Sequence, residues 1–474
     1  MADNTSPSSL HVVLFPFMAK GHTIPILQLA RLLLRRNATV TIFTTPANYP
    51  YISTSLSDTS TSIISLPFPK NIPGVPPGVE SMDTLPSLSL FFPFVSSTKL
   101  MQPDFEKVVQ SLKTPVTFMI TDGFFGWTLE SANKFNIPRL VYYGMSNYAI
   151  TVSRVMSFHN HLFEGKSGGD PVIVPEFPWL TVTRDEFNDT FNGRDTDSPF
   201  AKWTLDTTLA ASKSYGLVTN SFCELEPVYM EYWNSKLGPK SWSVGPFCLG
   251  QKVTKTKLLS SQKPSWMVWL DKKLDLGSPV LYVAFGSQAE ISQDQIEEIK
   301  VGLEKSGVSF LWVMRRRENG VQPTSDDEFE ERVKEKGIVV REWVNQREIL
   351  EHEIVKGFVS HCGWNSVLES ICAGVPIIAW PLSAEQPLNA KFVVDDIKIG
   401  VRVETCDGSV IGFVKGDGLE KKVKELMEGE KGKEVRKKVA ELRNSAMKAV
   451  EEGGSSWRCL NELIDELQNK SITS

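Results

Sequence analysis

Short apolar runs alternate along the chain with longer amphipathic stretches, and this alternation is the feature that most limits the possible folds. Strands that are buried on both faces are almost continuously apolar, and parallel strands need a long crossover connection, usually a helix. Between the first two apolar runs, residues 24–36 place apolar side chains at helical spacing. The pattern predicts an α/β fold with parallel sheets.

The candidate strands form two series, separated by a polar, Lys- and Ser-rich stretch. The first series comprises residues 11–17, 39–45, 62–68, 116–122, 139–143 and 215–222. The second comprises residues 279–287, 309–315, 337–343, 355–360, 375–381 and 399–404. The charged stretch 411–470 is helical in pattern, with helix ends expected near Gly429 and Gly453-Gly454. We therefore expect two facing Rossmann-like domains, 1–245 and 264–455, a linker at 246–263, and a C-terminal helix at 456–474 that packs back on the first domain.

The charge and cysteine content exclude several classes of protein. The net charge of −5 and the sequence pI near 5.9 argue against a basic face that binds nucleic acid. The stretch MADNTSPSSL lacks the order of a signal peptide, and no apolar run is long enough to span a membrane. The six cysteines form no CxxC pair, which favours free thiols in a reducing compartment. We expect a cytoplasmic monomer.

Residues that directly follow the strands are the candidate ligand contacts, because open parallel sheets bind ligands beyond the carboxyl ends of their strands. In the second domain, HCGWNSVLES (361–370) follows the fourth strand. Backbone N–H groups at a helix start, with Gly363 allowing close approach, form an anion site, and His361 can donate to a phosphate oxygen. The alternative is that Gly363 only makes a turn and that Ser366-x-x-Glu369 is a capping box. Neither GxGxxG nor GxxxxGK[ST] is present to support a phosphate site independently.

The stretch from Trp343 to Gln386, WVNQREILEHEIVKGFVSHCGWNSVLESICAGVPIIAWPLSAEQ, widens the motif. Along its whole length it resembles the signature box of plant family 1 UDP-glycosyltransferases, the secondary-product glycosyltransferases. The turn GHTIP near the start and EEGGSSW before the last helix extend a weaker resemblance over the whole chain. The resemblance implies a GT-B fold, in which a cleft lies between two Rossmann-like domains, and an inverting, metal-independent transfer from a UDP-sugar without any cofactor.

Particular roles follow from the resemblance. It implies that Trp343 stacks on the uracil, that Gln346 holds the base, that Glu369 accepts from the ribose hydroxyls, and that His361 and nearby backbone hold the diphosphate. The full set implied to bind UDP is Ser287, Trp343, Val344, Gln346, His361, Gly363, Trp364, Asn365, Ser366 and Glu369. The set implied to bind the sugar is Thr23, Tyr143, Glu385 and Gln386, and a final Gln386 favours glucose.

His22 and Asp122 are the candidate catalytic pair. His22 lies just after the first strand, in FPFMAKGHTIP, and Asp122 lies at the end of the fourth, in ITDGFFGW. A neutral imidazole can take a proton at physiological pH, and a carboxylate on its second nitrogen would fix the tautomer. The resemblance makes His22 the base on the acceptor hydroxyl, with Asp122 orienting it. The alternatives are a core or surface histidine and an aspartate that only forms the turn before Gly123.

One position departs from the family pattern. The family has a tryptophan and then Thr or Ser after the strand that here ends in VYYGMS (141–146), and these side chains touch the donor sugar. Here the two positions hold Tyr143 and Gly144, so the hydroxyl contact is missing or comes from Ser146. Aromatic residues that are expected to line a pocket for a flat apolar acceptor, such as a flavonoid or phenol, are Phe17, Phe94, Phe124 and Phe125.

Some residue patterns suit functions other than sugar transfer from a UDP-sugar. Asp195-x-Asp197 could bind Mn²⁺ in a metal-dependent transferase, but it lies in a polar loop; His159-x-His161 could ligate zinc, but no Cys or carboxylate cluster lies nearby in sequence. An oxidoreductase lacks its glycine fingerprint. A nucleotide-sugar sensor without catalysis, and C-glycosylation of a phenol ring, remain alternatives.

Overall fold

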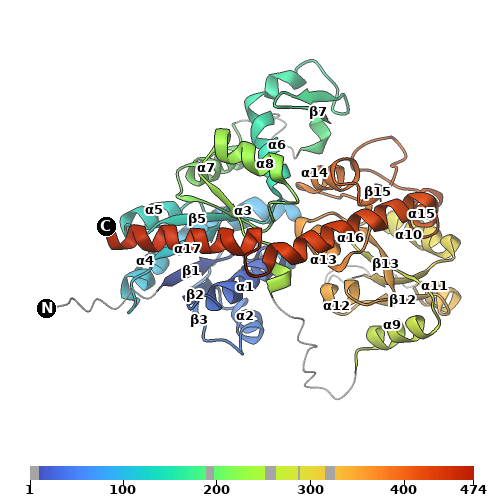
Figure 1. Ribbon diagram of the computed structural model, residues 1–474, viewed down its shortest axis with the longest axis horizontal. Helices are drawn as coiled ribbons and strands as arrows, with labels where there is room; N and C mark the ends of the chain where they lie inside the picture. Colours follow the sequence, from blue (N-terminus) through green and yellow to red (C-terminus); the bar gives the residue numbers. More distant parts are fainter. Residues whose placement is uncertain (1–9, 188–196, 251–262, 287–288, 315–325, 474) are drawn as a thin grey trace. The chain divides into compact units, whose positions relative to one another are not determined.

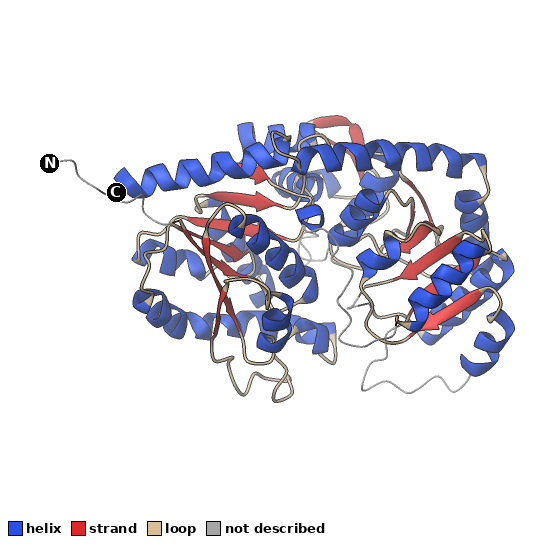
Figure 2. Ribbon diagram, turned by 60° about the horizontal axis from the view of Figure 1, so that its bottom comes forward, coloured by secondary structure: helices blue, strands red, loops and turns tan. Residues whose placement is uncertain are grey.

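The computed structural model describes residues 10–187, 197–250, 263–286, 289–314 and 326–473. These residues form two compact units, and the chain passes between the units several times. The first unit holds the described parts of 1–147, 193–251 and 448–474, and the second holds those of 148–192 and 252–447. Each unit is built around a parallel sheet flanked by helices (Figures 1 and 2).

The first unit contains a seven-stranded sheet in which all strand pairs are parallel. In order across the sheet, its strands are β3 (Ser62–Ser65), β2 (Thr39–Thr44), β1 (His11–Phe15), β4 (Phe118–Asp122), β5 (Arg139–Tyr143), β8 (Gly216–Thr219) and β9 (Ser241–Ser243). The strands run outward from β1 in one direction as far as β3, and the order then reverses to continue at β4. This is the doubly wound Rossmann order, whose reversal point lies between β1 and β4.

Helices cover both faces of this sheet. They are α1 (Lys20–Leu34), α2 (Tyr49–Ser55), α3 (Phe91–Ser97), α4 (Gln102–Ser111), α5 (Thr128–Lys134), α7 (Pro199–Ser212), α8 (Pro227–Tyr232) and α17 (Ser455–Thr473), with short helical turns η1 (Met82–Thr84), η2 (Leu88–Leu90), η3 (Thr98–Met101), η6 (Trp233–Leu237) and η7 (Phe247–Gly250). Alternate residues of β1 show why two layers are needed. Val12 and Leu14 join one buried cluster, while Val13 and Phe15 join another. A strand that is apolar at every position needs cover on both sides.

The last helix, α17, belongs to the first unit although it ends the chain (Figure 1). Its buried face adds Leu460, Leu463, Ile464 and Leu467 to the cluster that contains Val12 and Leu14. Polar contacts fix its position as well: Arg36 Nε of the first unit donates to Asn461 Oδ1 at 2.6 Å, and Tyr215 donates to Glu466 at 2.7 Å. The last helix of the chain and its first strand therefore share one hydrophobic core.

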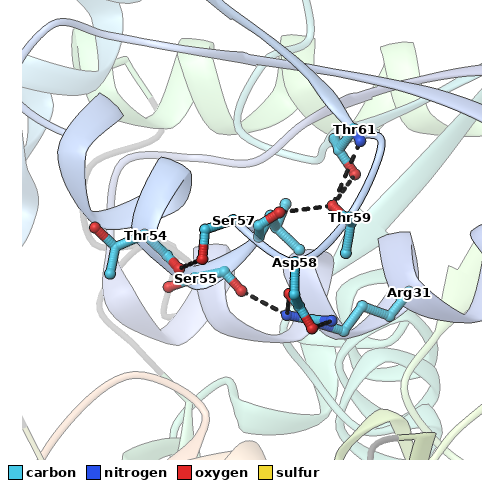
Figure 3. A network of polar contacts seen from close by, with 8 residues as sticks. Arg31, Thr54, Ser55, Ser57, Asp58, Thr59 and Thr61 are labelled. Carbon is cyan, nitrogen blue, oxygen red and sulfur yellow. Dashed lines mark hydrogen bonds and ion pairs between the residues drawn. The ribbon is translucent and has the colours of Figure 1, made fainter. Parts of the chain in front are cut away.

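A surface network ties α1 to the turn that follows α2 (Figure 3). Arg31 of α1 donates to both carboxylate oxygens of Asp58, at 2.9 and 2.6 Å, and to the Ser55 carbonyl at 2.7 Å. Inside the turn, the Thr59 hydroxyl donates to the Leu56 carbonyl at 2.7 Å. Asp58 is mostly exposed, so the ion pair mainly orients the turn rather than stabilising the fold.

The second unit contains a six-stranded sheet that repeats the same order. Its strands are β12 (Gly337–Val340), β11 (Ser309–Val313), β10 (Val280–Ala284), β13 (Val355–Ser360), β14 (Ile377–Ala379) and β15 (Gly400–Arg402), all paired in parallel. Its helices are α9 (Ser265–Asp275), α10 (Gln293–Ser306), α11 (Asp326–Val333), α12 (Gln346–Leu350), α13 (Trp364–Ala373), α14 (Gln386–Lys391), η8 (Phe392–Asp396), α15 (Gly416–Met427) and α16 (Glu430–Val450). The order reverses between β10 and β13.

A segment from the middle of the chain also packs with the second unit. It holds α6 (Asn147–Phe158), η4 (Asn160–Phe163), the hairpin of β6 (Val172–Val174) with β7 (Phe177–Val182), and η5 (Arg184–Glu186). The Tyr148 ring stacks on Phe392 with centroids 5.0 Å apart, and Glu186 pairs with Lys391 at 3.4 Å. These contacts explain why residues 148–187 group with the second unit, whereas the sequence predicted them in a first domain of residues 1–245.

The predicted strands of both series are confirmed as parallel strands, with ends that differ by a few residues. The expected helix ends at Gly429 and at Gly453-Gly454 are confirmed, since α15, α16 and α17 are separated there. The hairpin and most first-unit helices were not predicted. Most of the predicted linker lies outside the described residues. Among the helices that the structure describes, none combines the length and apolarity needed to cross a bilayer.

Replacing Leu463 by alanine tests the contribution of α17 to the first unit. Leu463 is fully buried, so Leu463→Ala should lower the free energy of unfolding by about 2–5 kcal/mol. Asp465→Ala is the matched control on the exposed face of the same helix, and we expect a change of at most about 0.5 kcal/mol. Urea titrations followed by tryptophan fluorescence would measure both. Equal midpoints for the two variants would contradict the packing of α17.

Candidate active site

His22 lies in the first turn of α1, two residues after the helix begins. The helix start has no cap from its own N-cap residue, Ala19; instead Asp83, from η1, accepts from the Lys20 N–H at 2.7 Å. The same segment is tied to the β1–α1 turn by a bond from the Met82 N–H to the Met18 carbonyl at 2.8 Å. A carboxylate at a helix N-terminus is favourable, so Asp83 fixes the turn that carries His22.

The structure brings His22 and Asp122 together. Nδ1 of His22 lies 2.7 Å from Oδ2 of Asp122, whose other oxygen accepts from the Phe124 N–H at 3.0 Å. An ionised carboxylate can only accept hydrogen bonds, so Nδ1 carries the hydrogen and Nε2 is left with its lone pair. Asp122 is 1% exposed and His22 is 21% exposed, so the carboxylate is enclosed while the imidazole still reaches the surface of the unit. This arrangement suits a base with an orienting carboxylate.

The four predicted acceptor-lining phenylalanines do not share one environment. Phe17, Phe94 and Phe125 are completely buried in the core between the sheet and the helices of the first unit, so their prediction as pocket residues is wrong in this structure. Their size and apolarity serve packing, which apolar residues do far more often. Only Phe124 is partly exposed, with its ring centroid 5.2 Å from that of His22.

Further aromatic residues that the sequence analysis did not single out surround Phe124. Phe91 of α3 lies 5.5 Å from the Phe124 ring, and Trp203 of α7 lies 5.6 Å from it. Phe200 stacks on Trp203 at 5.8 Å with an angle of 13° between the rings. All of these side chains are partly exposed. Partly exposed aromatic rings beside His22 form a more suitable apolar surface than the buried phenylalanines.

The predicted sugar contacts of the first unit differ in how accessible they are. Thr23 is buried and its hydroxyl donates to the Phe17 carbonyl at 3.1 Å, so the structure gives it a structural role. Tyr143 is partly exposed, and its ring packs so closely on Gly123 that a Cβ there would lie 2.1 Å from it. A Cβ on Gly144 would lie 3.8 Å from His22 Cε1 and 3.9 Å from Nε2. The glycine at this position therefore leaves room at the Nε2 edge of His22.

In the second unit, His361 directly follows β13. Two glycines enclose its ring: a Cβ on Gly286, after β10, would lie 2.8 Å from Nε2, and one on Gly363 would lie 2.5 Å from it. Nδ1 is buried and makes no hydrogen bond within the described residues. Burial lowers the pKa of His361 to about 4, so the ring is neutral at physiological pH. A neutral ring with an unpaired nitrogen can donate a hydrogen bond to an added ligand.

The turn after His361 brings the chain into α13. Cys362 adopts a left-handed conformation with φ of 62°, and the Asn389 side chain donates to its carbonyl at 3.0 Å. The helix begins at Trp364 with Gly363 as N-cap, and no side chain caps it. The capping-box alternative for Ser366 and Glu369 is therefore wrong. The predicted phosphate contacts at Trp364, Asn365 and Ser366 all lie in this first turn, where N–H groups lack helical partners.

Glu369 is instead part of a side-chain cluster with Gln346 and Ser366. The Gln346 amide donates to Glu369 Oε2 at 2.7 Å and to Ser366 Oγ at 2.9 Å. Burial raises the pKa of Glu369, whereas the bond from Gln346 opposes that shift. The carboxylate is thus held by one amide, and its partly exposed position leaves room for donors such as the two hydroxyls of a ribose.

Trp343 lies just before this cluster and is 57% exposed, which is unusual for so large an apolar side chain. Its neighbour Val344 is buried and anchors the segment. Glu385 is the N-cap of α14, and Gln386 starts the helix. The side-chain oxygen Oε1 of Gln386 accepts from the N–H groups of Leu382 and Ser383 at 2.9 and 3.0 Å, so Gln386 also shapes its own loop.

Several predicted positions carry no structural test. Ser287 and Asp195 lie outside the described residues. His159 and His161 have ring centroids 6.0 Å apart, and His159 Nδ1 faces the Val155 carbonyl at 3.0 Å. Within the described ranges, no group of three or more His, Cys, Asp or Glu side chains is arranged to hold a metal ion.

Comparison of the chain with known proteins identifies its family. Residues 276–445 match the family described as UDP-glucoronosyl and UDP-glucosyl transferase. Over 468 residues the chain is 53% identical to UDP-glycosyltransferase 90A1 of Arabidopsis thaliana, with 96% of each sequence covered. This protein belongs to the plant family 1 UDP-glycosyltransferases. It is therefore an enzyme that transfers a sugar from a UDP-sugar.

Solved structures of other members support the same fold. The chain is 32% identical to Glycyrrhiza uralensis UGT73P12 in complex with glycyrrhetinic acid 3-O-monoglucuronide, with a TM-score of 0.87, covering 98% of this chain and 97% of that one. It is 28% identical to Phytolacca americana UGT2 in complex with UDP-2fluoro-glucose and pterostilbene, with a TM-score of 0.80, covering 97% of this chain and all of that one. The two Rossmann-like units of this glycosyltransferase form the GT-B fold.

Gly286→Ala tests whether the position of His361 matters for UDP binding by this glycosyltransferase. The added Cβ would push the His361 ring from its place, so UDP affinity should fall roughly tenfold to a hundredfold, the size expected for one lost bond to a charged phosphate. Gly408→Ala is the matched control, because Gly408 has a similar φ, 74° against 82°, but open space at its Cβ. Calorimetric titration with UDP would measure both. An equal loss in the two variants would attribute the effect to backbone strain.

Proposed function

We propose that this enzyme transfers glucose from UDP-glucose to a hydroxyl group of a small aromatic or apolar plant metabolite, with a flavonoid or simple phenol favoured. His22 is the base in this proposal, and Asp122 orients it. The observation that carries the proposal is the 2.7 Å contact between Nδ1 of His22 and the buried carboxylate of Asp122. That contact leaves Nε2 as the proton acceptor.

The proposed reaction balances without a redox step. Nε2 of His22 takes the proton of the acceptor hydroxyl while that oxygen attacks the anomeric carbon of glucose. The bond from that carbon to the diphosphate oxygen breaks, UDP leaves, and the configuration inverts from α to β. Asp122 stabilises the imidazolium that forms, as the carboxylate does in hydrolase triads.

The leaving UDP gains negative charge, and the second unit offers groups that suit it. The uncapped start of α13 presents N–H groups, and neutral His361 has Nδ1 unpaired within the described residues. Such prearranged donors stabilise developing charge. We propose that these groups replace a metal ion and that no other cofactor takes part.

The choice of glucose rests on Gln386 and on a relative. The Phytolacca americana enzyme holds UDP-2fluoro-glucose, a glucose donor analogue. The choice of an aromatic acceptor rests on the partly exposed rings of Phe91, Phe124 and Trp203 near His22. Pterostilbene, bound to the same relative, is a phenol with two flat rings. The Glycyrrhiza uralensis enzyme binds glycyrrhetinic acid 3-O-monoglucuronide, so terpenoids belong in the test.

The reaction class can be tested by mass spectrometry. We expect the purified protein with UDP-glucose to add one hexose to at least one member of a panel of flavonoids, phenols, plant hormones and terpenoids, with and without EDTA. Acid hydrolysis of the product distinguishes an O-glycoside from a C-glycoside, which resists it. Loss of transfer in EDTA would refute the metal-free proposal. Measurable UDP binding without transfer from UDP-glucose, UDP-galactose or UDP-xylose would favour a sensor.

The roles of His22 and Asp122 can be tested on whichever acceptor the panel identifies. His22→Ala should lower kcat by at least about a hundredfold, and Asp122→Asn by roughly 10²–10⁴, because the base or its tautomer is lost. UDP affinity should not change, since the UDP contacts lie in the second unit. His161→Ala replaces an exposed histidine and should match the wild type. A His22→Ala variant that retains wild-type turnover would refute the assignment of the base.

A further inference from the structure

Arg139 is a buried cation directly behind the proposed catalytic pair. It is the first residue of β5 and is only 2% exposed. Its Nε donates to the hydroxyls of Thr121 and Thr128, both at 2.8 Å, and its Nη1 donates to the Ser214 hydroxyl at 2.7 Å. Burying a guanidinium is costly unless its donors are satisfied, and here hydroxyl groups from three parts of the chain satisfy them.

The remaining guanidinium nitrogen holds the turn that presents Asp122. Nη2 donates to the carbonyl of Asp122 at 3.3 Å and to that of Phe125 at 3.2 Å. Between these residues the turn is closed by a bond from the Phe125 N–H to the Asp122 carbonyl at 3.0 Å. Arg139 thus joins both ends of the turn, while the Asp122 carboxylate faces away toward His22.

Arg139 forms no ion pair within the described part of the chain: its bonds go to hydroxyls and backbone carbonyls. Burial lowers its pKa to about 10, which still leaves it charged at neutral pH, and Asp122 opposes that shift. The nearby positive charge compensates the burial of the Asp122 carboxylate, which is 1% exposed and would otherwise be costly to ionise.

We propose that Arg139 is a positioning residue for the base: its guanidinium fixes the turn that presents Asp122, and its charge sets the basicity of His22. The proposal rests on the proposed function, in which His22 takes the acceptor proton. In this proposal, Arg139 acts on His22 through Asp122 and contacts neither the substrate nor the imidazole.

The sign of the electrostatic effect follows from the charges. A positive charge near His22 disfavours the protonated imidazole, so Arg139 keeps His22 available as a base at lower pH. Removing that charge should move the titration of His22 upward. Among the described residues, other charged or titratable groups on the elements around the pair include Tyr142 and Tyr143 on β5, Lys20 on α1 and Asp83 on η1. Burial raises the pKa of Tyr142, which stays neutral, and the Asp83 carboxylate accepts from the Lys20 N–H. None of these four residues is replaced in the variants below.

The titration of His22 can be measured without catalysis. Protein labelled with ¹³C at histidine Cε1 gives one NMR signal for each of its six histidines, and His22→Gln identifies the signal of His22. In Arg139→Met the midpoint of that signal should rise by about one pH unit, the order expected for loss of a neighbouring charge. The acid limb of kcat/KM should move by the same amount. KM for UDP-glucose should not change, while kcat should fall roughly tenfold or more.

Ser214 provides variants that separate charge from packing. Ser214→Asp would place a carboxylate against Nη1, so it cancels the charge while the guanidinium stays in place; the midpoint should rise as in Arg139→Met. Ser214→Ala removes the same acceptor but leaves the charge, and its midpoint should match the wild type. Arg139→Lys keeps a charge but loses the bonds to the turn, so kcat should fall without a shift of the midpoint.

The outcomes distinguish this proposal from the proposed function. A midpoint that stays within about 0.2 pH unit of the wild type in both Arg139→Met and Ser214→Asp would overturn the role of Arg139. Should Arg139→Met fail to fold, Ser214→Asp decides alone. If His22→Ala retains turnover, the assignment of the base fails. The NMR midpoint then still reports whether Arg139 controls His22.

Discussion

The reversal of strand order in each sheet determines where everything else in this glycosyltransferase can act. In a doubly wound parallel sheet, the crossovers on either side of the reversal run in opposite directions, so the carboxyl ends of the two central strands are left open between them. In the first unit these strands are β1 and β4, and in the second they are β10 and β13. The chain places His22 and Asp122 at the carboxyl ends of the first pair, and Gly286 and His361 at those of the second. One rule of topology thus positions both candidate sites.

Burial of charge is what makes the first of these positions chemically useful. Asp122 is enclosed, so its carboxylate must be compensated from inside the unit, and hydroxyl-bound Arg139 supplies the charge without pairing with it directly. A direct ion pair would occupy the oxygens that His22 and the Phe124 N–H need. Glu369 in the second unit is a carboxylate that is stabilised in a different way. It has an amide partner, Gln346, and its pKa is raised by burial, so it gains from hydroxyl donors of a ligand.

The strands could be predicted because short, continuously apolar runs alternate with amphipathic stretches along the chain. Such runs suit strands that are buried on both faces of a sheet. Their ends were less certain, because buried apolar residues continue past the last strand residue: Phe17 follows β1 and Phe285 follows β10, and both are buried. His22 and Asp122 could be selected because Asp122 ends β4 and His22 lies in the first turn of the helix that follows β1. Parallel strands bring such residues to one edge of the sheet.

Apolarity alone could not separate pocket from core, which is why Phe17, Phe94 and Phe125 were misassigned. The cap that Asp83 provides for α1 could not be predicted from a local pattern, because Asp83 lies 63 residues further along the chain than the N–H that it binds. Arg139 could have been noticed, because it is a charged residue at the start of an apolar strand. Its partners, however, come from β4, from α5 and from Ser214 in the turn after α7, and no sequence spacing connects those segments.

The two histidines at the two reversal points show how environment assigns different roles to one side chain. The Asp122 carboxylate lies 2.7 Å from Nδ1 of His22, so Nε2 is the nitrogen that can take a proton. His361 lies between two glycines with no carboxylate bonded to it in the described residues, and burial keeps it neutral down to about pH 4. A neutral ring can donate to a diphosphate without competing for the acceptor proton. In the proposed reaction, the two histidines would divide proton transfer from anion binding, as enzymes do when they separate the titration of similar groups.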